Sequence, residues 1–359
     1  MRGSPVDNSN IVVAIPVRDE AARIRPCLIA LNQQMRVPDG VVLMLNNCTD
    51  ETETITRAMI PKLRFPLDII SRDLPLAQAD AGHARGLAMD VAAERAGSSG
   101  VLLTTDADST VPPDWVIRNL ASLRQGVDIV CGRAVIDPIE AAVIPAHLHA
   151  DDALECRLIA LLDDVAWMLD PEPHDPPLRH TEASGATLAV TVAAFHRVGG
   201  IPAMASGEDR AFVRALWMMD ARVRHDPTIQ VTVSGRVEGR APGGMADAIR
   251  RRIVQQDEFA DEMAEPAMDA YLRYSLRQRV RRVWRGLADP ALAGDLGLSW
   301  AKVATAVADR YFGGAWAKLE AASPVLQRRR VRFTELPAEI ETARMLRHRL
   351  TTPETLAAD

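Results

Sequence analysis

Residues 101–109 read Val-Leu-Leu-Thr-Thr-Asp-Ala-Asp-Ser, an apolar run that ends at two carboxylates one residue apart. Side chains of a strand alternate with a period of two residues, so Asp106 and Asp108 should lie on the same side of the chain. They are expected where the strand leaves the sheet, which is the edge where open α/β sheets bind ligands. Two close carboxylates repel each other, and a divalent cation that also binds a ligand's phosphates would relieve this repulsion.

Patterns typical of strands and helices alternate along the first half of the chain. Short apolar runs predict strands at residues 11–16, 41–45, 67–70, 101–105 and 128–132. Helical spacing of apolar residues, or a high alanine content, predicts helices at residues 21–34, 49–59, 82–96 and 115–124. Such alternation with short connections predicts an α/β fold, with a mostly parallel sheet covered by helices on both faces.

The same patterns predict how the chain is divided. Residues 1–10 are polar and are expected to be a disordered tail, and residues 11–244 are expected to form the α/β domain. Within it, residues 137–181 hold an acidic helix candidate and a proline-rich loop, which are expected to be an insert or a lid. Residues 245–359 are expected to form a mainly helical C-terminal region.

The composition excludes several classes of protein. The chain has 359 residues, of which 48% are hydrophobic, enough for a substantial core. A net charge of −6 argues against a general nucleic-acid binder. No apolar run approaches the roughly 20 residues of a membrane span, and the polar start has no signal-peptide core. Four scattered cysteines without a CxxC pair are typical of reduced thiols, so a cytoplasmic location is expected.

Six short segments resemble the motifs of one family, in that family's order. They are residues 15–20 (the first strand and its turn), 46–52 (the turn after the second strand), 82–85 (a helix start with an arginine), 106–108 (a DxD motif), 185–200 (an acceptor-side segment) and 207–209 (an ED motif). The chain thereby resembles family 2 glycosyltransferases, which have the GT-A fold of nucleotide-diphospho-sugar transferases. The resemblance covers roughly residues 10–244 and implies a hexosyltransferase-type enzyme with a GT-A-like sheet.

The resemblance implies a metal-dependent, inverting transfer of a sugar from a nucleotide-diphosphate-sugar donor to an acceptor hydroxyl. It assigns Asp108 to a divalent metal, Mg²⁺ or Mn²⁺, and Asp106 to the donor's ribose or the metal's waters. It assigns Asp209, together with Glu208, to catalysis, with Asp209 as the general base. A carboxylate at a helix start is also favoured by the helix dipole, so a simple helix cap is the competing interpretation of this pair.

The donor contacts implied by the resemblance come from several turns. They are Pro16, Arg18, Glu20, Asn46, Asn47, Arg85 and Asp106. Arg236 and Arg240 stand four residues apart in a glycine-rich stretch and are predicted to clamp a diphosphate, since guanidinium groups bind phosphate oxygens bidentately. The competing interpretation of that stretch is a surface loop. Leu45 stands where relatives often carry an aspartate that contacts the base, so the base identity is open.

Other functions are open from the sequence. A nucleotidyltransferase of related fold usually has a glycine-rich loop after its first strand, and residues 16–20 contain no glycine. A catalytically inactive sugar-nucleotide or partner-binding relative is favoured by Leu45 and disfavoured by the presence of Asp108 and Asp209. The acceptor is a small molecule, a saccharide or a lipid, and the oligomeric state is open. The basic amphipathic stretch 272–284 leaves a peripheral membrane contact open, although packing with its arginines in solvent is favoured.

Overall fold

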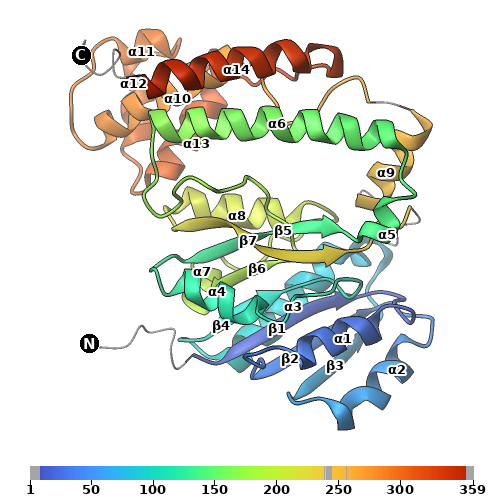
Figure 1. Ribbon diagram of the computed structural model, residues 1–359. Coiled ribbons are helices and arrows are strands. Elements are labelled where there is room, and N and C mark those ends of the chain that lie inside the picture. Colours follow the sequence, from blue (N-terminus) through green and yellow to red (C-terminus); the bar gives the residue numbers. More distant parts are fainter. Residues whose placement is uncertain (1–8, 238, 240–244, 256, 353–359) are drawn as a thin grey trace. The chain divides into compact units, whose positions relative to one another are not determined.

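The structure is a computed structural model that describes residues 9–237, 239, 245–255 and 257–352 (Figure 1). The chain divides into two compact units. The first comprises Met1–Ile144, Glu182–Trp217 and Ala221–Arg251, and the second comprises Pro145–Thr181, Met218–Asp220 and Arg252–Asp359. Most of the stretch that was expected to be an insert or a lid therefore belongs to the same unit as the C-terminal helices.

The first unit is built on a seven-stranded sheet. Its strands are β1 (Ile11–Val17), β2 (Gly40–Asn46), β3 (Leu67–Arg72), β4 (Val101–Thr104), β5 (Ile129–Ile136), β6 (Leu188–Thr191) and β7 (Val223–Val233). Their order across the sheet is β3-β2-β1-β4-β6-β5-β7. Strand β6 runs antiparallel to β4 and β5, and the other pairs are parallel. The predicted mostly parallel sheet is confirmed.

Helices cover both faces of this sheet (Figure 1). Helices α1 (Ile24–Asn32), α2 (Thr52–Met59) and α4 (Trp115–Leu123) bury apolar side chains on one face, together with Val13 and Ile15 of β1. Helices α3 (Ala81–Ala96), α7 (Val192–Arg197) and α8 (Glu208–Met218) do so on the other face, together with Val12 and Ala14. Strands buried on both faces read as continuous apolar runs, which explains the pattern of β1, β2 and β4.

Short helices complete the first unit. They are η1 (Ile60–Lys62), η2 (Leu76–Gln78), α5 (Pro138–Ala141) and the start of α9 (Met245–Val254). Helix α3 begins at Asp80, whose carboxylate accepts a hydrogen bond from the His83 N–H at 2.9 Å. It ends at Gly97, which has a φ of +71° that an L side chain rarely adopts.

The second unit is helical. It contains α6 (Ala146–Leu169), α10 (Ala267–Trp284), α11 (Leu292–Asp295), α12 (Trp300–Val307), α13 (Phe312–Ala322), η3 (Phe333–Glu335) and α14 (Leu336–Thr351). Helices α6 and α14 lie side by side (Figure 1), and together with α10 they bury an apolar core that includes Leu158, Val165 and Ile340. Within the described residues, no helix is both long enough and apolar enough to cross a membrane.

Helix α10 packs inside the second unit, but the expectation that its arginines stay in solvent is wrong for two of them. Arg273 and Arg277 are only 3% and 5% exposed. Arg273 pairs with Glu265 at 2.8 Å, and Arg277 pairs with Asp170. Each guanidinium can be buried because a carboxylate within the same unit compensates its charge.

Candidate active site

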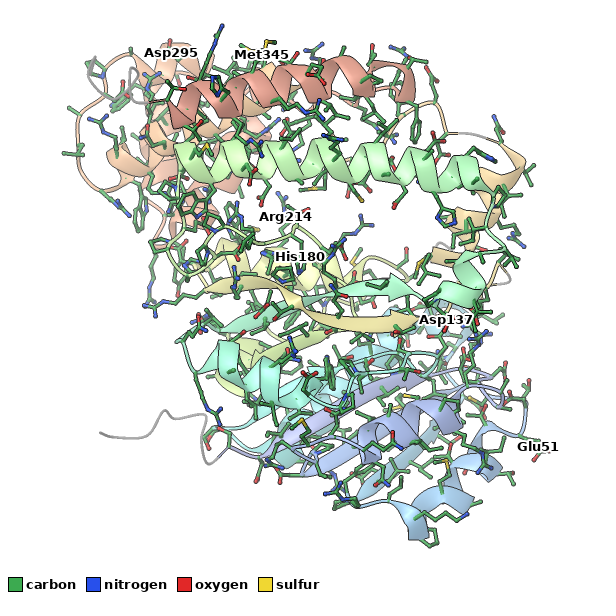
Figure 2. All side chains as sticks on the ribbon, in the orientation of Figure 1. Glu51, Asp137, His180, Arg214, Asp295 and Met345 are labelled. Carbon is green, nitrogen blue, oxygen red and sulfur yellow. The ribbon has the colours of Figure 1, made fainter. Side chains whose placement is uncertain are left out.

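The turns that carry most of the predicted site residues leave one edge of the sheet. Strands β1, β2 and β4 are parallel, so residues 18–20, 46–47 and 105–109 all lie at or just after the carboxyl ends of neighbouring strands. In Figure 2, Glu51 and Asp137, which come shortly after the ends of β2 and β5, lie on the same side of the sheet in the view. The candidate site of the first unit is therefore at the edge that the sequence indicated.

A buried arginine connects the DxD and ED segments. Arg85, on α3, is 4% exposed. Its Nε donates to Glu208 Oε1 at 2.9 Å, its Nη1 to Thr104 Oγ1 at 2.8 Å and to the Gly185 carbonyl at 2.9 Å, and its Nη2 to Asp106 Oδ1 at 2.7 Å. The sequence grouped Arg85 with the donor contacts and gave no sign of these partners, which stand 19 to 123 residues away.

Asp209 lies in the first turn of α8 and also contacts Gly185. Its Oδ2 accepts a hydrogen bond from the Gly185 N–H at 2.8 Å, and its Oδ1 accepts one from the Arg210 N–H at 2.7 Å. Ionised carboxylate oxygens have about four acceptor sites, so these two bonds leave capacity for a hydroxyl. The geometry accommodates both a helix-start role and a catalytic role for Asp209, and it places buried Glu208 against Arg85.

Asp108 lies in a second charged cluster. Arg236, which follows β7, binds Glu20 through both terminal nitrogens at 2.6 and 3.0 Å and lies 3.2 Å from Asp108 Oδ2. The stretch that presents Arg236 is held by Glu140, whose Oε2 accepts the Gly235 N–H at 2.6 Å. The structure thus brings Arg236 together with Glu20 and Asp108. Its predicted companion Arg240 lies outside the described residues.

The electrostatics of this cluster favour a cation. Burial, together with the neighbouring negative charge of Asp106, raises the pKa of Asp108 to about 6, and the positive charge of Arg236 opposes this rise. Among the described residues, no group of three or more carboxylate, histidine or cysteine side chains is arranged to hold a metal. Mg²⁺ in phosphate-binding sites typically needs only one or two protein carboxylates besides the substrate's phosphates, so the Asp106–Asp108 pair fits such an ion.

Two of the predicted donor residues also tie the edge to residues 74–80. Arg18 Nη1 donates to the Ala79 carbonyl at 2.5 Å. Asn47 has a φ of +51°, and its side-chain amide makes two bonds of 3.1 Å with the backbone of Leu74. Both side chains therefore help to hold this edge of the sheet in shape.

Asn46 ends β2 and offers an unused acceptor. Its Nδ2 donates to the Asp80 carbonyl at 2.9 Å, whereas its buried Oδ1 has no hydrogen-bond partner among the described residues. Leu45, the departure noted in the sequence, is fully buried in the core on one face of the sheet, and Pro16 is buried within β1. The residue that follows Leu45 in the sequence, Asn46, therefore provides an amide at the end of β2.

Asp19 lies in the motif of residues 15–20, but the sequence did not indicate a role for it. Asp19 has a φ of +50°, and its Oδ1 accepts hydrogen bonds from the N–H groups of Thr49 at 2.6 Å and Asp50 at 3.2 Å. Asp50 Oδ2 in turn accepts the Ala21 N–H at 3.0 Å. These reciprocal bonds fix the turn after β1 to the turn after β2, and the positive φ at Asp19 is not visible in a sequence pattern.

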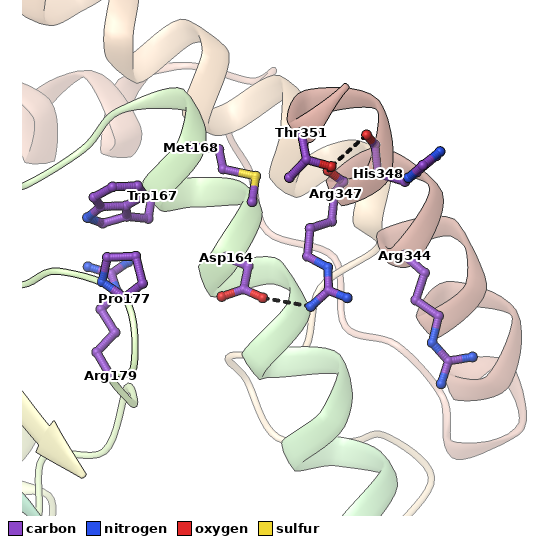
Figure 3. Close-up of a pocket in the computed structure, with 9 residues that line it drawn as sticks. All are labelled: Asp164, Trp167, Met168, Pro177, Arg179, Arg344, Arg347, His348 and Thr351. Atoms are coloured by element: carbon purple, nitrogen blue, oxygen red, sulfur yellow. Dashed lines mark hydrogen bonds and ion pairs between the residues drawn. The ribbon is translucent and has the colours of Figure 1, made fainter. Parts of the chain in front are cut away.

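A pocket of about 380 Å³ lies in the second unit, between α6, α14 and residues 177–179 (Figure 3). None of the predicted site residues lines it. Its arginines are paired with carboxylates, as in Arg347 with Asp164 at 3.0 Å and Arg179 with Asp163 at 2.6 Å. The pocket therefore presents little uncompensated charge to a ligand.

Comparison with known proteins gives a family match for part of the chain. Residues 12–168 match the family model described as Glycosyl transferase family 2. No curated protein matches the sequence.

Several solved structures are similar at low sequence identity. TarS of S. aureus in complex with UDP-GlcNAc is 15% identical, with 94% of this chain and 90% of that chain covered and a TM-score of 0.48. The mannosyltransferase PcManGT of Pyrobaculum calidifontis in complex with GDP-Man and Mn²⁺ is 20% identical, with 89% and 87% covered and a TM-score of 0.46. Glucosyl-3-phosphoglycerate synthase of Mycobacterium tuberculosis, in complex with Mn²⁺, UDP and phosphoglyceric acid, is 15% identical, with 80% and 82% covered and a TM-score of 0.41.

Proposed function

We propose that this chain, whose residues 12–168 match the family model described as Glycosyl transferase family 2, is a metal-dependent, inverting glycosyltransferase that uses a nucleotide-diphosphate-sugar donor. One observation supports the proposal most strongly. A single guanidinium, that of Arg85, contacts Asp106 of the DxD segment and Glu208 of the ED segment. The DxD segment, which carries the proposed metal ligand Asp108, and the start of α8, which carries the proposed base Asp209, are therefore joined at one edge of the sheet.

On the donor side, Asp108 would hold Mg²⁺ or Mn²⁺, which would supply Lewis-acid stabilisation of the leaving diphosphate, and Asp106 would contact the donor's ribose or the metal's waters. Arg236 lies beside them, and its planar guanidinium is suited to phosphate oxygens. The buried Asn46 Oδ1 is available to accept a hydrogen bond from the nucleoside. The other proposed donor residues are Pro16, Arg18, Glu20, Asn47 and Arg240.

On the acceptor side, Asp209 would accept the proton of the attacking hydroxyl. The hydroxyl oxygen forms a bond to the anomeric carbon, and the bond from that carbon to the phosphate oxygen breaks with its electron pair on the diphosphate. Attack by an oxygen activated on the face opposite the leaving group inverts the anomeric configuration. Glu208, held by Arg85, keeps the start of α8 in place.

Nucleotidyl transfer and a membrane contact are less well supported than the proposed function. The family match favours glycosyl transfer over nucleotidyl transfer. The ion pairs of Arg273 and Arg277 give α10 a packing role, so a membrane contact by this helix forms no part of the proposal. We propose a cytoplasmic enzyme whose acceptor is a small molecule, a saccharide or a lipid.

Donor binding is tested by thermal shift with UDP-, GDP- and TDP-sugars in the presence of Mg²⁺ or Mn²⁺. At least one nucleotide should raise the melting temperature only when metal is present, and EDTA should abolish the rise. Asp108→Ala should lose the metal-dependent rise, whereas Asp114→Asn, at the start of α4, should keep it. If no nucleotide gives a metal-dependent rise, the donor proposal fails.

The catalytic base is tested separately with Asp209→Asn. Transfer, or slow hydrolysis of the donor where no acceptor is supplied, should fall by roughly 10²-fold or more, because general-base catalysis contributes about that much. Nucleotide binding should not change. A variant that turns over at the normal rate would show that Asp209 is only part of a helix start.

A further inference from the structure

Arg85 is almost wholly enclosed by protein. Its guanidinium carries five N–H groups, and the four bonds to Thr104, Asp106, Gly185 and Glu208 use four of them. The side chain of Asp106 is 34% exposed, whereas that of Arg85 is 5% exposed. A donor arriving from solvent therefore meets the Asp106 carboxylate first, with the Arg85 guanidinium behind it.

Gly185 carries the contact from Arg85 to Asp209. Its carbonyl accepts from Arg85 Nη1 at 2.9 Å, and its N–H donates to Asp209 Oδ2 at 2.8 Å. A Cβ at position 185 would lie 2.4 Å from the Arg85 Cζ, so only a glycine leaves room for the guanidinium. One peptide thus joins the arginine to the proposed base.

We propose that Arg85 is a positioning residue that fixes Asp106 and Asp209 relative to each other, and that it does not contact the donor. It holds Asp106 directly, and it holds Asp209 through Gly185 and through the neighbouring Glu208. The inference rests on the proposed function, because it concerns the spacing of the donor and acceptor carboxylates of that site.

The charges explain why an arginine is needed here. Without the guanidinium, Asp106 and Glu208 would lose their shared positive partner, and the repulsion between the two carboxylates would favour their moving apart. A lysine keeps one positive charge but lacks the planar fork that serves acceptors on four segments at once. Arg85→Lys therefore keeps the positive charge at this position and removes the hydrogen-bonding geometry of the guanidinium.

The kinetic test compares Arg85→Lys with Arg95→Lys. Arg95 lies on the same helix, is largely exposed and pairs with Asp68. For Arg85→Lys, turnover should fall by roughly 10²-fold because misplaced reacting groups lose about that much rate. The dissociation constants of UDP and GDP with Mg²⁺ should stay within about threefold of wild type, since a lost charged phosphate contact would weaken binding by about tenfold or more.

Gly185→Ala should have the same effect as Arg85→Lys, a lower turnover with unchanged nucleotide binding, because the added Cβ displaces the guanidinium. Arg95→Lys should match the wild type in both measurements. Weakening of nucleotide binding by tenfold or more in Arg85→Lys, with unchanged turnover at saturation, would overturn the proposal and make Arg85 a donor contact.

Two measurements separate this inference from the proposed function. In the ligand-free protein, hydrogen exchange at the Gly185 amide should speed up in Arg85→Lys and not in Arg95→Lys, and equal exchange in both would overturn the inference whatever the enzyme does. In the wild-type chain, the Arg85 Nε–H signal in a nitrogen-15 spectrum should keep its position when UDP or GDP is added with Mg²⁺. A large displacement of that signal would also overturn it, and this measurement requires no variant to fold.

Discussion

Asp108 lies in an environment that differs clearly from that of an ordinary surface carboxylate. Burial and the neighbouring Asp106 charge raise its pKa to about 6, although Arg236 lies 3.2 Å away. When the ionised form of a carboxylate is disfavoured by its surroundings, a cation that binds together with a ligand stabilises that ionised form. Such perturbed groups gather at functional sites, which supports the assignment of Asp108 to the metal.

The same shift predicts how Asp108→Asn changes stability. The folded-state pKa lies above the usual value of 3.8, so between about pH 4 and pH 6 the folded chain holds a proton that the unfolded chain has released. The free energy of unfolding of the wild type therefore falls as the pH rises through this window. Because the variant lacks this titration, it should melt a few degrees above the wild type at pH 7.5 with EDTA, a gap of at most about 3 kcal/mol, and should match it near pH 4.

Melting curves of both proteins across this pH range test the prediction. Asp114→Asn is the matched control and should differ from the wild type by the same amount at each pH. A variant of Asp108 that melts below the wild type at pH 7.5 would show that its charge stabilises the empty site.

At the scale of the element, the start of α3 is fixed by a close approach. A Cβ at Gly82 would lie 2.1 Å from the Met204 carbonyl oxygen, whereas a Cβ at Gly86, one turn later, would meet Ile201 only at an ordinary 3.7 Å. The two glycines therefore have different physical roles in one helix. Gly82 allows α3 to touch the segment that leads into Glu208, and Gly86 merely lowers helix stability.

Gly82→Ala and Gly86→Ala should consequently change stability in opposite directions. The first forces the two segments apart and should cost about 1–3 kcal/mol, in the range of overpacking substitutions, with a loss of turnover. The second should stabilise the protein by about 0.4–1 kcal/mol. Urea denaturation of the two variants checks both signs, and a tolerated Gly82→Ala would contradict the close approach.

The elements themselves were largely predictable from the sequence. The predicted strands at 11–16, 41–45 and 67–70 fall within β1, β2 and β3. Strands β1 and β2 are buried along their whole length, and strands buried on both faces leave a local apolar signature. The predicted helix at 21–34 is shorter in the structure, where α1 spans Ile24–Asn32 and residues 21–23 form a turn. The hydrogen bonds of Arg85 could not be predicted from local patterns, because its partners are distant in the sequence and lie near it only in the folded sheet.

At the scale of the molecule, the second unit contains the least predictable interactions. Asp170, which is 3% exposed as a side chain, accepts hydrogen bonds from both Arg277 and Arg281 of α10. Arg277 also binds Glu172 at 2.6 Å, and Arg281 lies 3.9 Å above the ring centroid of Phe312. The sequence showed a basic helix and a proline-rich loop more than a hundred residues apart, and nothing local indicated that they neutralise each other.

Asp170→Asn should therefore destabilise the second unit strongly. Removal of one partner from a buried ion pair costs about 3–5 kcal/mol, because the remaining charge loses its compensation. Here two guanidinium groups lose a partner, although both still pair with Glu172. Hydrogen exchange of amides in α6 and α10 should accelerate accordingly. The control Asp269→Asn removes the partner of Arg329, a side chain that is 69% exposed, and should leave exchange unchanged because solvent already screens that pair. Equal exchange in the two variants would mean that the Asp170 cluster contributes no more than a surface pair, and that the apolar contacts between α6, α10 and α14 hold the unit together unaided.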